Sequence, residues 1–387
     1  MSSANLSSRD RVLAAISHRQ PDRIPVDFWA AGEVFTQLQQ ALNLPDKEAV
    51  MKFAGADLRY FNGPAYIGAT AQGPAGKSAA AQGPAGEALP PGVVSDHWGV
   101  LRQVSTVSGQ RRDGTTYTWT YKHLHKAPLA DATTVEQIER HPWPTADMWD
   151  YSNVRSACGA IRDSGSCVVA GADRLDRTAQ LKPAMYIRGT EQFMADLVLE
   201  PQIADCLLEH ISDYYLQYNR RFFEAAGGTI DIFFMGDDMG TQASTWVSPE
   251  MYRRFFKRRF AAYCDLAHRH GMKVMYHTCG NVAPLVGDFI EAGLDILQSL
   301  QPAALGDQLP VLKREYGKDL SFQGGIDIQN VLPSGTPADV AEHVRQRAAM
   351  LGAGGGYIFG TAHNILPDTP TENILALIEA YREFGKY

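Results

Sequence analysis

The sequence of 387 residues has few cysteines, no long apolar run and no cluster of basic residues. Its five cysteines are an odd number at scattered positions, which gives no disulfide framework and favours a reducing compartment. No stretch approaches the roughly 18 apolar residues of a membrane span, and the N-terminus lacks the apolar core of a signal peptide. The net charge of −7 argues against nucleic acid and anionic membranes as partners. We therefore expect a soluble, cytoplasmic protein with a small-molecule substrate, either a monomer or a homodimer.

Three motifs that mark common cofactor and catalytic sites are also absent. No GxGxxG follows an expected strand, no GxxxxGK[ST] loop occurs, and no GxSxG is present. These absences argue against a Rossmann dinucleotide site, a P-loop and the nucleophile elbow of an α/β-hydrolase. The glycine-rich run at 352–356 precedes an expected strand and does not open a helix, so we interpret it as a tight turn.

What is present is an ordinary globular composition with one low-complexity insertion. Hydrophobic residues make up 45% and charged residues 20%, and the length suits one barrel domain over 1–387. The insertion at 66–92 contains AQGPAGKSAA (71–80) followed by the near-duplicate AQGPAGEALP (81–90). It is either a lid over the site or a surface insertion. We favour a surface insertion that contributes little to stability, because Gly, Pro, Ala and Gln bury almost no apolar area.

Apolar, strand-like runs alternate with amphipathic helices along the C-terminal part of the chain. Such alternation predicts parallel strands, and two short runs near the N-terminus bring the count to eight. We therefore predict a (β/α)₈ TIM-type barrel with an N-terminal extension and a β-hairpin insertion, although a doubly wound sheet shows the same alternation. The expected strands are 25–28, 57–61, 167–171, 230–235, 273–277, 296–300, 320–323 and 357–360, the hairpin is 103–126, and the clearest helices are 8–16, 33–42, 134–140, 249–270 and 337–351.

Polar residues with catalytic potential follow several of these strands, where the active site of a barrel lies. His277 and Cys279 are two residues apart, so in an extended segment both point the same way. An imidazole and a thiolate on one face suit Zn²⁺, and His363 could supply the third protein ligand of a catalytic zinc site. The alternative is that Cys279 is a buried structural cysteine.

Two carboxylate positions also have more than one interpretation. Asp237 and Asp238 are adjacent, so only one of them enters a pocket if the strand continues. We favour Asp238 as the catalytic residue, while an aspartate at this position could instead cap the following turn. Asp327 either contacts substrate or caps the following helix.

Segments in the same order along the chain resemble the uroporphyrinogen-decarboxylase superfamily. They span nearly the whole chain except 66–92 and the hairpin, and they imply the barrel fold and a site at the strand ends. With this resemblance, Arg188, Gln242, Gln323 and Asp327 become the expected substrate-binding residues. The matching segments are Arg9–Leu13 with Pro21–Val26, Asp96–Val100, Ile187–Gly189, Gly236–Gly240, His277–Gly280, Gln323–Asp327 and Ile365–Pro370 with Glu372 and Asn373.

The superfamily includes two chemistries, and one of them fits this sequence poorly. Uroporphyrinogen carries eight carboxylates, and the decarboxylase branch uses an arginine-rich N-terminal motif. The corresponding residues 27–33 contain no arginine here. Without arginine partners, the negative charge of such a substrate would not be neutralised in the site, which argues against the heme-pathway decarboxylase.

The other branch consists of cobalamin-linked methyltransferases, whose zinc site resembles H-x-C with a later Cys. His277 and Cys279 match the first two positions, and His363 stands near the third. Zinc would deprotonate an acceptor thiol, and the thiolate would then take a methyl group from cobalt. A folate acceptor would instead need an acid such as Asp238. The sequence has no DxHxxG motif, so the resemblance implies a corrinoid carried by a separate protein.

We therefore expect a corrinoid-linked, zinc-assisted methyltransferase with a thiol or folate acceptor. One alternative is a metal-free decarboxylase or other lyase, for which Arg174, Arg177 and Arg188 are the arginines to find in the pocket. A second alternative is a non-catalytic binding member of the superfamily, whose pocket would be filled by side chains.

Overall fold

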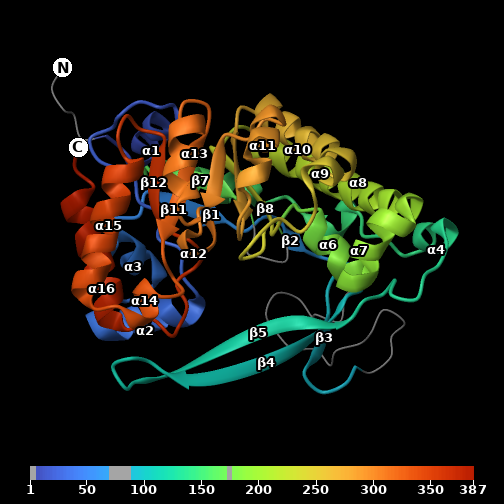
Figure 1. Cartoon of the computed structure of the whole chain (residues 1–387), viewed down its shortest axis with the longest axis horizontal. Coiled ribbons are helices and arrows are strands. Elements are labelled where there is room, and N and C mark those ends of the chain that lie inside the picture. The colour runs from blue at the N-terminus through green and yellow to red at the C-terminus, as the bar shows by residue number, and fades with distance from the viewer. Residues whose placement is uncertain (1–5, 69–88, 172–176) are drawn as a thin grey trace.

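A computed structural model describes residues 6–68, 89–171 and 177–387, and its centre is a curled parallel sheet (Figure 1). Seven predicted runs are confirmed as strands of this sheet. Their order follows the sequence without reversal, which excludes the doubly wound alternative. The strands, in spatial order, are β1 (Leu58–Phe61), β7 (Cys167–Ala170), β8 (Ile232–Asp237), β9 (Lys273–Thr278), β10 (Ile296–Ser299), β11 (Ser321–Ile326) and β12 (Tyr357–Thr361).

The predicted eighth strand, at 25–28, is reduced to a single bridge between the two edges of this sheet. Val26 pairs with Phe359 of β12 in parallel, and the Asp57 N–H just before β1 donates to the Val26 carbonyl at 2.7 Å. Pro25 has no backbone N–H to donate, so the hydrogen-bond ladder with the neighbouring strands cannot continue through this residue. The described residues thus form seven strands joined edge to edge by one short segment, and the full eight-stranded barrel is not reached.

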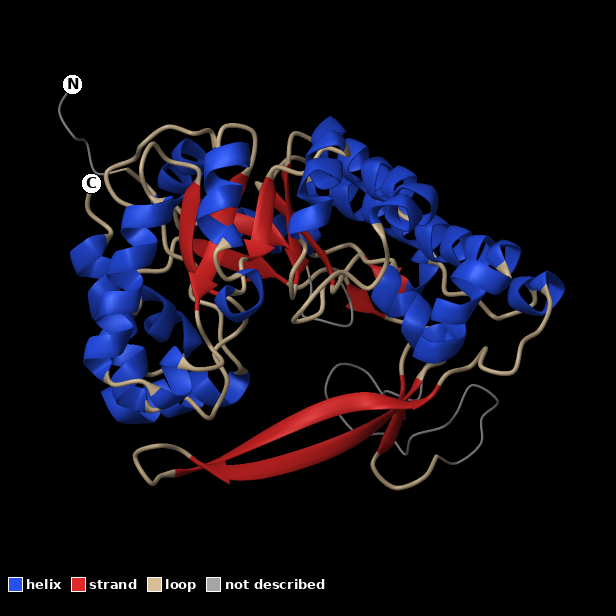
Figure 2. Ribbon diagram, in the orientation of Figure 1, coloured by secondary structure: helices blue, strands red, loops and turns tan. Residues whose placement is uncertain are grey.

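Helices lie outside the strands (Figure 2). The helices predicted at 8–16 and 337–351 are found with those bounds, whereas the one predicted over 249–270 is broken at Phe256. Phe255 and Phe256 are both buried there, although they are consecutive. No described helix is both long and apolar enough to cross a membrane. The helices are α1 (Ser8–Ile16), α2 (Gly32–Leu42), α3 (Lys47–Phe53), α4 (Val135–Glu139), α5 (Val154–Asp163), α6 (Leu181–Arg188), α7 (Thr190–Leu199), α8 (Pro201–Ala226), α9 (Pro249–Phe255), α10 (Lys257–Arg269), α11 (Val286–Glu291), α12 (Pro302–Leu305), α13 (Gln308–Tyr316), α14 (Val331–Ser334), α15 (Pro337–Leu351) and α16 (Thr371–Phe384).

The predicted hairpin forms a long antiparallel arm made of β4 (Leu101–Gln110) and β5 (Thr116–Lys126), with β3 (Val93–Ser95) beside β4. Figure 1 shows it running along one side of the molecule from near α7 to near α2. At its tip, Arg111 donates to the Pro367 carbonyl at 2.7 Å and to Gln37 Oε1 at 3.1 Å. The arm is therefore held at both ends. Two short strands, β2 (Ala65–Tyr66) and β6 (Trp149–Asp150), pair with each other nearby. Most of the insertion predicted at 66–92 lies outside the described residues.

The inward-facing side chains of the sheet alternate along each strand, as the period of two requires. At one level they are apolar and pack against Val12 and Ile16 of α1, which closes that end of the sheet. This apolar layer includes Leu58, Met275 and Ile296. Two residues further along, the inward positions of β9 and β10 are polar (His277 and Gln298), whereas Val169 on β7 and Phe234 on β8 are still apolar. The apolar floor is therefore followed by polar side chains on the β9 and β10 side of the sheet.

Candidate active site

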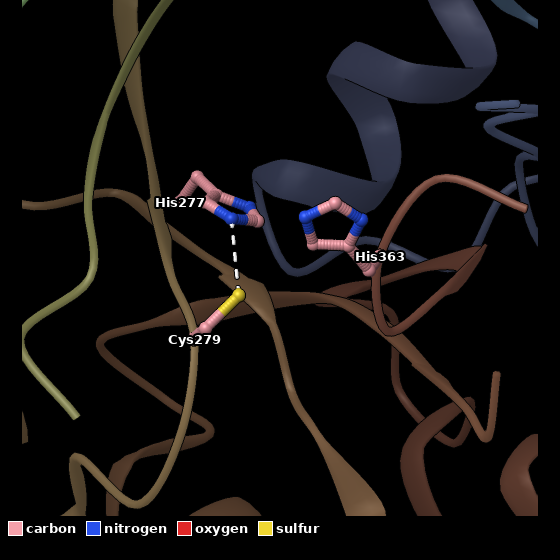
Figure 3. A group of neighbouring side chains, drawn as sticks. All are labelled: His277, Cys279 and His363. Atoms are coloured by element: carbon pink, nitrogen blue, oxygen red, sulfur yellow. Dashed lines mark hydrogen bonds between the residues drawn. The ribbon is translucent and has the colours of Figure 1, made fainter. Parts of the chain in front are cut away.

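Three predicted metal ligands come together at the carboxyl ends of β9 and β12. His277 lies near the end of β9, Cys279 follows that strand, and His363 follows β12. One ligand atom from each residue lies within 4.8 Å of the other two, and His277 Nε2 is 3.3 Å from Cys279 Sγ. In Figure 3 the sulfur points toward the His277 ring, and the His363 ring lies beside them.

This group fits a metal such as zinc. With zinc at its usual distances from nitrogen and sulfur, tetrahedral geometry places those two atoms about 3.5 Å apart. The separation of 3.3 Å between His277 Nε2 and Cys279 Sγ is close to that value. Two imidazoles and one thiolate are ligands that zinc and similar divalent metals prefer, and three protein ligands leave a fourth position for substrate.

The surroundings of Cys279 and His277 favour the neutral forms of these two side chains when no cation is present. Burial raises the pKa of the Cys279 thiol, and the negative charge of Asp238 raises it further. Burial also lowers the pKa of His277, and the positive charge of Arg177 adds to this effect. A bound cation would reverse the situation for the thiol, because a coordinated thiol loses its proton.

The two adjacent aspartates have different partners, and the cap formed by Asp237 is on a helix that precedes it in the chain, not on the following turn. Asp237 accepts hydrogen bonds from the backbone N–H groups of Gln180 and Leu181, both at 2.7 Å, and of Lys182, so it caps the start of α6. Asp238 points the other way, pairs with Lys182 Nζ at 3.0 Å, and lies 3.7 Å from His277 Nε2. Burial is the largest influence on Asp238 and opposes its ionisation, but the positive charges of Lys182, His277 and Arg177 and the hydrogen bond from Lys182 together outweigh it and lower the pKa of that carboxyl.

A cavity of about 640 Å³ is lined by His277 and His363, and β5 forms part of its wall. The sequence predicted the hairpin, but nothing in its alternating pattern indicated that it would lie over the site. Lys182 was also missed, because it lies in α6 and not at a strand end. The cavity is lined by Glu33, Trp119, Thr120, Tyr121, Lys122, Arg177, Lys182, Tyr186, Asp238, His277, His363 and their neighbours.

Trp29 is a further residue that the sequence analysis missed. Its ring lies 5.5 Å from the ring centre of His277 and 5.2 Å from that of His363, so it packs against both ligands. Arg177 in turn lies over the Trp29 ring at 5.7 Å. Trp29 directly follows the expected strand 25–28, and that position was the signal that could have identified it.

Two predicted substrate-binding residues have structural partners instead. Arg188 is buried and donates to Asp196 Oδ2 at 2.7 Å, so its charge is neutralised inside the protein. Asp327 accepts the backbone N–H groups of Gln329 at 2.7 Å and Asn330 at 3.0 Å, so it caps the turn that precedes α14 and not the helix itself. Neither residue lines the cavity over His277.

The other two predicted substrate-binding residues also lie away from this cavity. Gln242 is exposed in the loop after β8, and Gln323 is buried inside the sheet, where it donates to Asp27 at 2.9 Å. Of the three arginines named for the decarboxylase alternative, Arg177 lines the cavity and Arg188 does not. Arg174 lies outside the described residues.

The fold and the site together define an α/β enzyme with a parallel, barrel-like sheet and a His/Cys/His group at its strand ends. The chain belongs to the uroporphyrinogen decarboxylase (URO-D) family, whose model matches residues 178–384. The family resemblance predicted from the sequence is therefore confirmed.

Relatives within the family have different activities. Over 208 residues the chain is 27% identical to a methylated-thiol–coenzyme M methyltransferase of Methanosarcina mazei, covering 53% of this chain and 52% of that protein. Over 201 residues it is 24% identical to a uroporphyrinogen decarboxylase of Coxiella burnetii, covering 49% and 50%. These alignments span about half the length of the curated relatives.

The fold also has a solved counterpart. A methyltransferase from Methanosarcina mazei superimposes with a TM-score of 0.66 over 98% of this chain and 99% of its own, at 18% identity. This likeness supports the fold of the whole chain, including the part that the family model does not match.

Proposed function

We propose that this protein is a zinc-assisted methyltransferase that moves a methyl group from a corrinoid protein or methylated substrate to a thiol or folate acceptor. The observation that carries the proposal is the convergence of His277, Cys279 and His363, with their ligand atoms within 4.8 Å of one another. The similarity to a methylated-thiol–coenzyme M methyltransferase supports the same reaction class.

The residues of the cavity have distinct roles in this proposal. His277, Cys279 and His363 would hold the metal, which when bound lowers the pKa of a substrate thiol and so supplies a thiolate nucleophile. Asp238 stands beside the ligands as a carboxylate paired with Lys182. Trp119 and Tyr121 of the hairpin line the cavity and offer aromatic surface to a substrate. The sequence has no corrinoid-binding motif, so the corrinoid would arrive on a separate protein.

Zinc content and methyl transfer test the proposal directly. Protein purified without chelator should contain about one zinc per chain, and Cys279→Ser should lose it. Cys206→Ser is the matched control, because Cys206 is a free cysteine on α8, far along the chain from the three ligands. Transfer from methylcobalamin to 2-mercaptoethanesulfonate should fall at least about 100-fold in Cys279→Ser and stay unchanged in the control.

A metal-free wild type with the same activity as Cys279→Ser would contradict the zinc mechanism. A cofactor-independent decarboxylase would then become the leading function, and one observation favours it as the second candidate. Arg177 lines the cavity, where its guanidinium could bind a substrate carboxylate. Release of CO₂ from carboxylated substrates by the metal-free protein would distinguish this activity from methyl transfer.

A further inference from the structure

A row of buried polar side chains crosses the inside of the sheet and ends at His277. Gln298 on β10 is the register partner of His277 on one side and of Gln323 on the other. Paired residues of parallel strands point to the same face, and Met275 and Ile296, two positions earlier, belong to the inward apolar layer. His277, Gln298 and Gln323 therefore face inward together, and each is at most 2% exposed.

The far end of this row is fixed by an acceptor. Asp27 Oδ2 accepts a hydrogen bond from the Tyr60 hydroxyl at 2.6 Å and another from Gln323 Nε2 at 2.9 Å. The Gln323 amide is thereby oriented with its nitrogen toward Asp27. Gly360 on β12 makes room for this nitrogen, since a Cβ there would lie 2.3 Å from it.

The orientation of Gln323 favours one orientation of Gln298. Gln298 Oε1 contacts His277 Nδ1, which leaves Gln298 Nε2 buried without a hydrogen-bond partner. Gln323 Oε1 is also buried without a partner. These are a donor and an acceptor on residues that are paired across neighbouring strands and face the same side of the sheet. Flipping the Gln298 amide would instead place two oxygens face to face, which costs free energy in a buried site.

We propose that this row holds His277 as the tautomer with its proton on Nδ1, and that Gln298 is a positioning residue for the metal site. A neutral imidazole carries one proton, and the bond made by one nitrogen decides which lone pair is left on the other. With Nδ1 donating to Gln298 Oε1, the Nε2 lone pair faces Cys279 Sγ, 3.3 Å away. The inference rests on the metal role proposed for His277, but the tautomer can be measured without metal.

The first measurement is the histidine tautomer in metal-free protein. Two-bond ¹H–¹⁵N correlation spectra of ¹⁵N-histidine-labelled chain distinguish the two tautomers, and His277→Gln identifies the signal. Wild type should show the proton on Nδ1. Gln298→Met, which keeps the length of the side chain and removes the acceptor, should shift His277 toward the other tautomer. Gln298→Glu retains an acceptor oxygen and should restore the wild-type signal.

The second measurement is zinc affinity by competition with a chromogenic chelator. Gln298→Met should weaken zinc binding by about 10- to 100-fold, as loss of a ligand's supporting hydrogen bond does elsewhere. Gln298→Glu should stay within about tenfold of wild type. Gln323→Leu should also weaken zinc binding, but by less than Gln298→Met does, because it removes only the group that orients the Gln298 amide. Thermal unfolding of each metal-free variant checks that the fold is kept.

Three results would overturn the inference or part of it. Wild-type His277 with its proton on Nε2 refutes it even if Gln298→Met fails to fold. An unchanged tautomer and unchanged zinc affinity in a folded Gln298→Met show that Gln298 has no positioning role. If Gln298→Met changes the His277 tautomer and the zinc affinity but Gln323→Leu changes neither, the positioning role is limited to Gln298. Failure of wild type to bind zinc contradicts the proposed function, and the tautomer measurement remains valid in that case.

Discussion

Asp27 is a carboxyl group enclosed within the sheet, with Tyr60 and Gln323 as its hydrogen-bond donors. Burial raises the pKa of Asp27 to about 6, and the two hydrogen bonds and the charge of Arg59 only partly oppose this effect. The folded protein thus holds the neutral carboxyl more readily than the unfolded chain does. Stability linked to this group is fully present below the ordinary pKa of 3.8 and is lost as the pH rises through 6.

Asp27→Asn should remove this pH dependence, because the amide cannot ionise and still offers an acceptor oxygen. The free energy of unfolding of wild type, measured relative to that of Asp27→Asn, should fall by about 1 kcal/mol between pH 5 and pH 7. Urea unfolding of both proteins at several pH values gives this difference. A difference that stays constant over that range would show that Asp27 does not titrate as described.

At the scale of single residues, the three proposed metal ligands lie together, whereas the four proposed substrate-binding residues do not line the cavity beside them. His277 and Cys279 could be found because their spacing and strand-end position are local features. The ion pair of Arg188 could not be predicted, because its partner Asp196 lies on another helix. The same holds for Gln323, whose partner Asp27 comes from the opposite end of the chain. A residue type shows what a side chain can bind, and only the fold shows what it meets.

Among the elements, the hairpin of β4 and β5 lines the cavity along part of its length and is attached to the rest of the molecule at its tip. Trp119 and Tyr121 of β5 line the cavity, while Arg111 fixes the tip to Pro367 and Gln37. Alternating residues at 103–126 predicted the two strands, but its docking depends on contacts between residues far apart in the sequence. The same limitation explains the break at Phe256, since periodicity alone predicted one continuous helix.

Arg111→Ala should loosen the hairpin without unfolding the protein. Loss of its hydrogen bonds lowers the free energy that holds the hairpin tip in place by about 1–2 kcal/mol. Cleavage by chymotrypsin after Tyr117 or Trp119 should therefore become about tenfold faster. The melting temperature should change little, because most of β5 is exposed. Mass spectrometry locates the cuts. Arg345→Ala is the control, since Arg345 forms an exposed ion pair within α15 and should leave cleavage unchanged. Equal rates in all three proteins would mean that Arg111 does not hold the tip.

For the whole molecule, Asp57 joins the N-terminal segment to the sheet. Its carboxylate is fully buried, accepts from Arg11 at 2.7 Å and from Arg23 at 2.8 Å, and also accepts the Val26 N–H at 2.8 Å. Seven of the eight predicted strands are present, and this network secures the segment that stands in the place of the eighth. Counting apolar runs could not reveal that outcome, because closure depends on the pairing of Val26 with Phe359.

Asp57→Asn should destabilise the whole fold by about 2–3 kcal/mol, because it removes the carboxylate that accepts from both Arg11 and Arg23, although Arg11 keeps Asp22 as a partner. Circular dichroism and tryptophan fluorescence should report the same shifted urea midpoint, since the segment connects both edges of one sheet. Arg345→Ala should cost no more than about 1 kcal/mol. Two separate transitions in Asp57→Asn would contradict the view that the closure supports one cooperative unit.

The pairing of Val26 with Phe359 has a consequence for how the protein is made. A ribosome releases the N-terminal residues first, yet their partner on β12 lies close to the end of the chain. Throughout most of translation, both edges of the growing sheet therefore expose unpaired backbone groups to other chains. A sheet of this kind needs protection against aggregation until β12 has emerged, because only then can Phe359 pair with Val26.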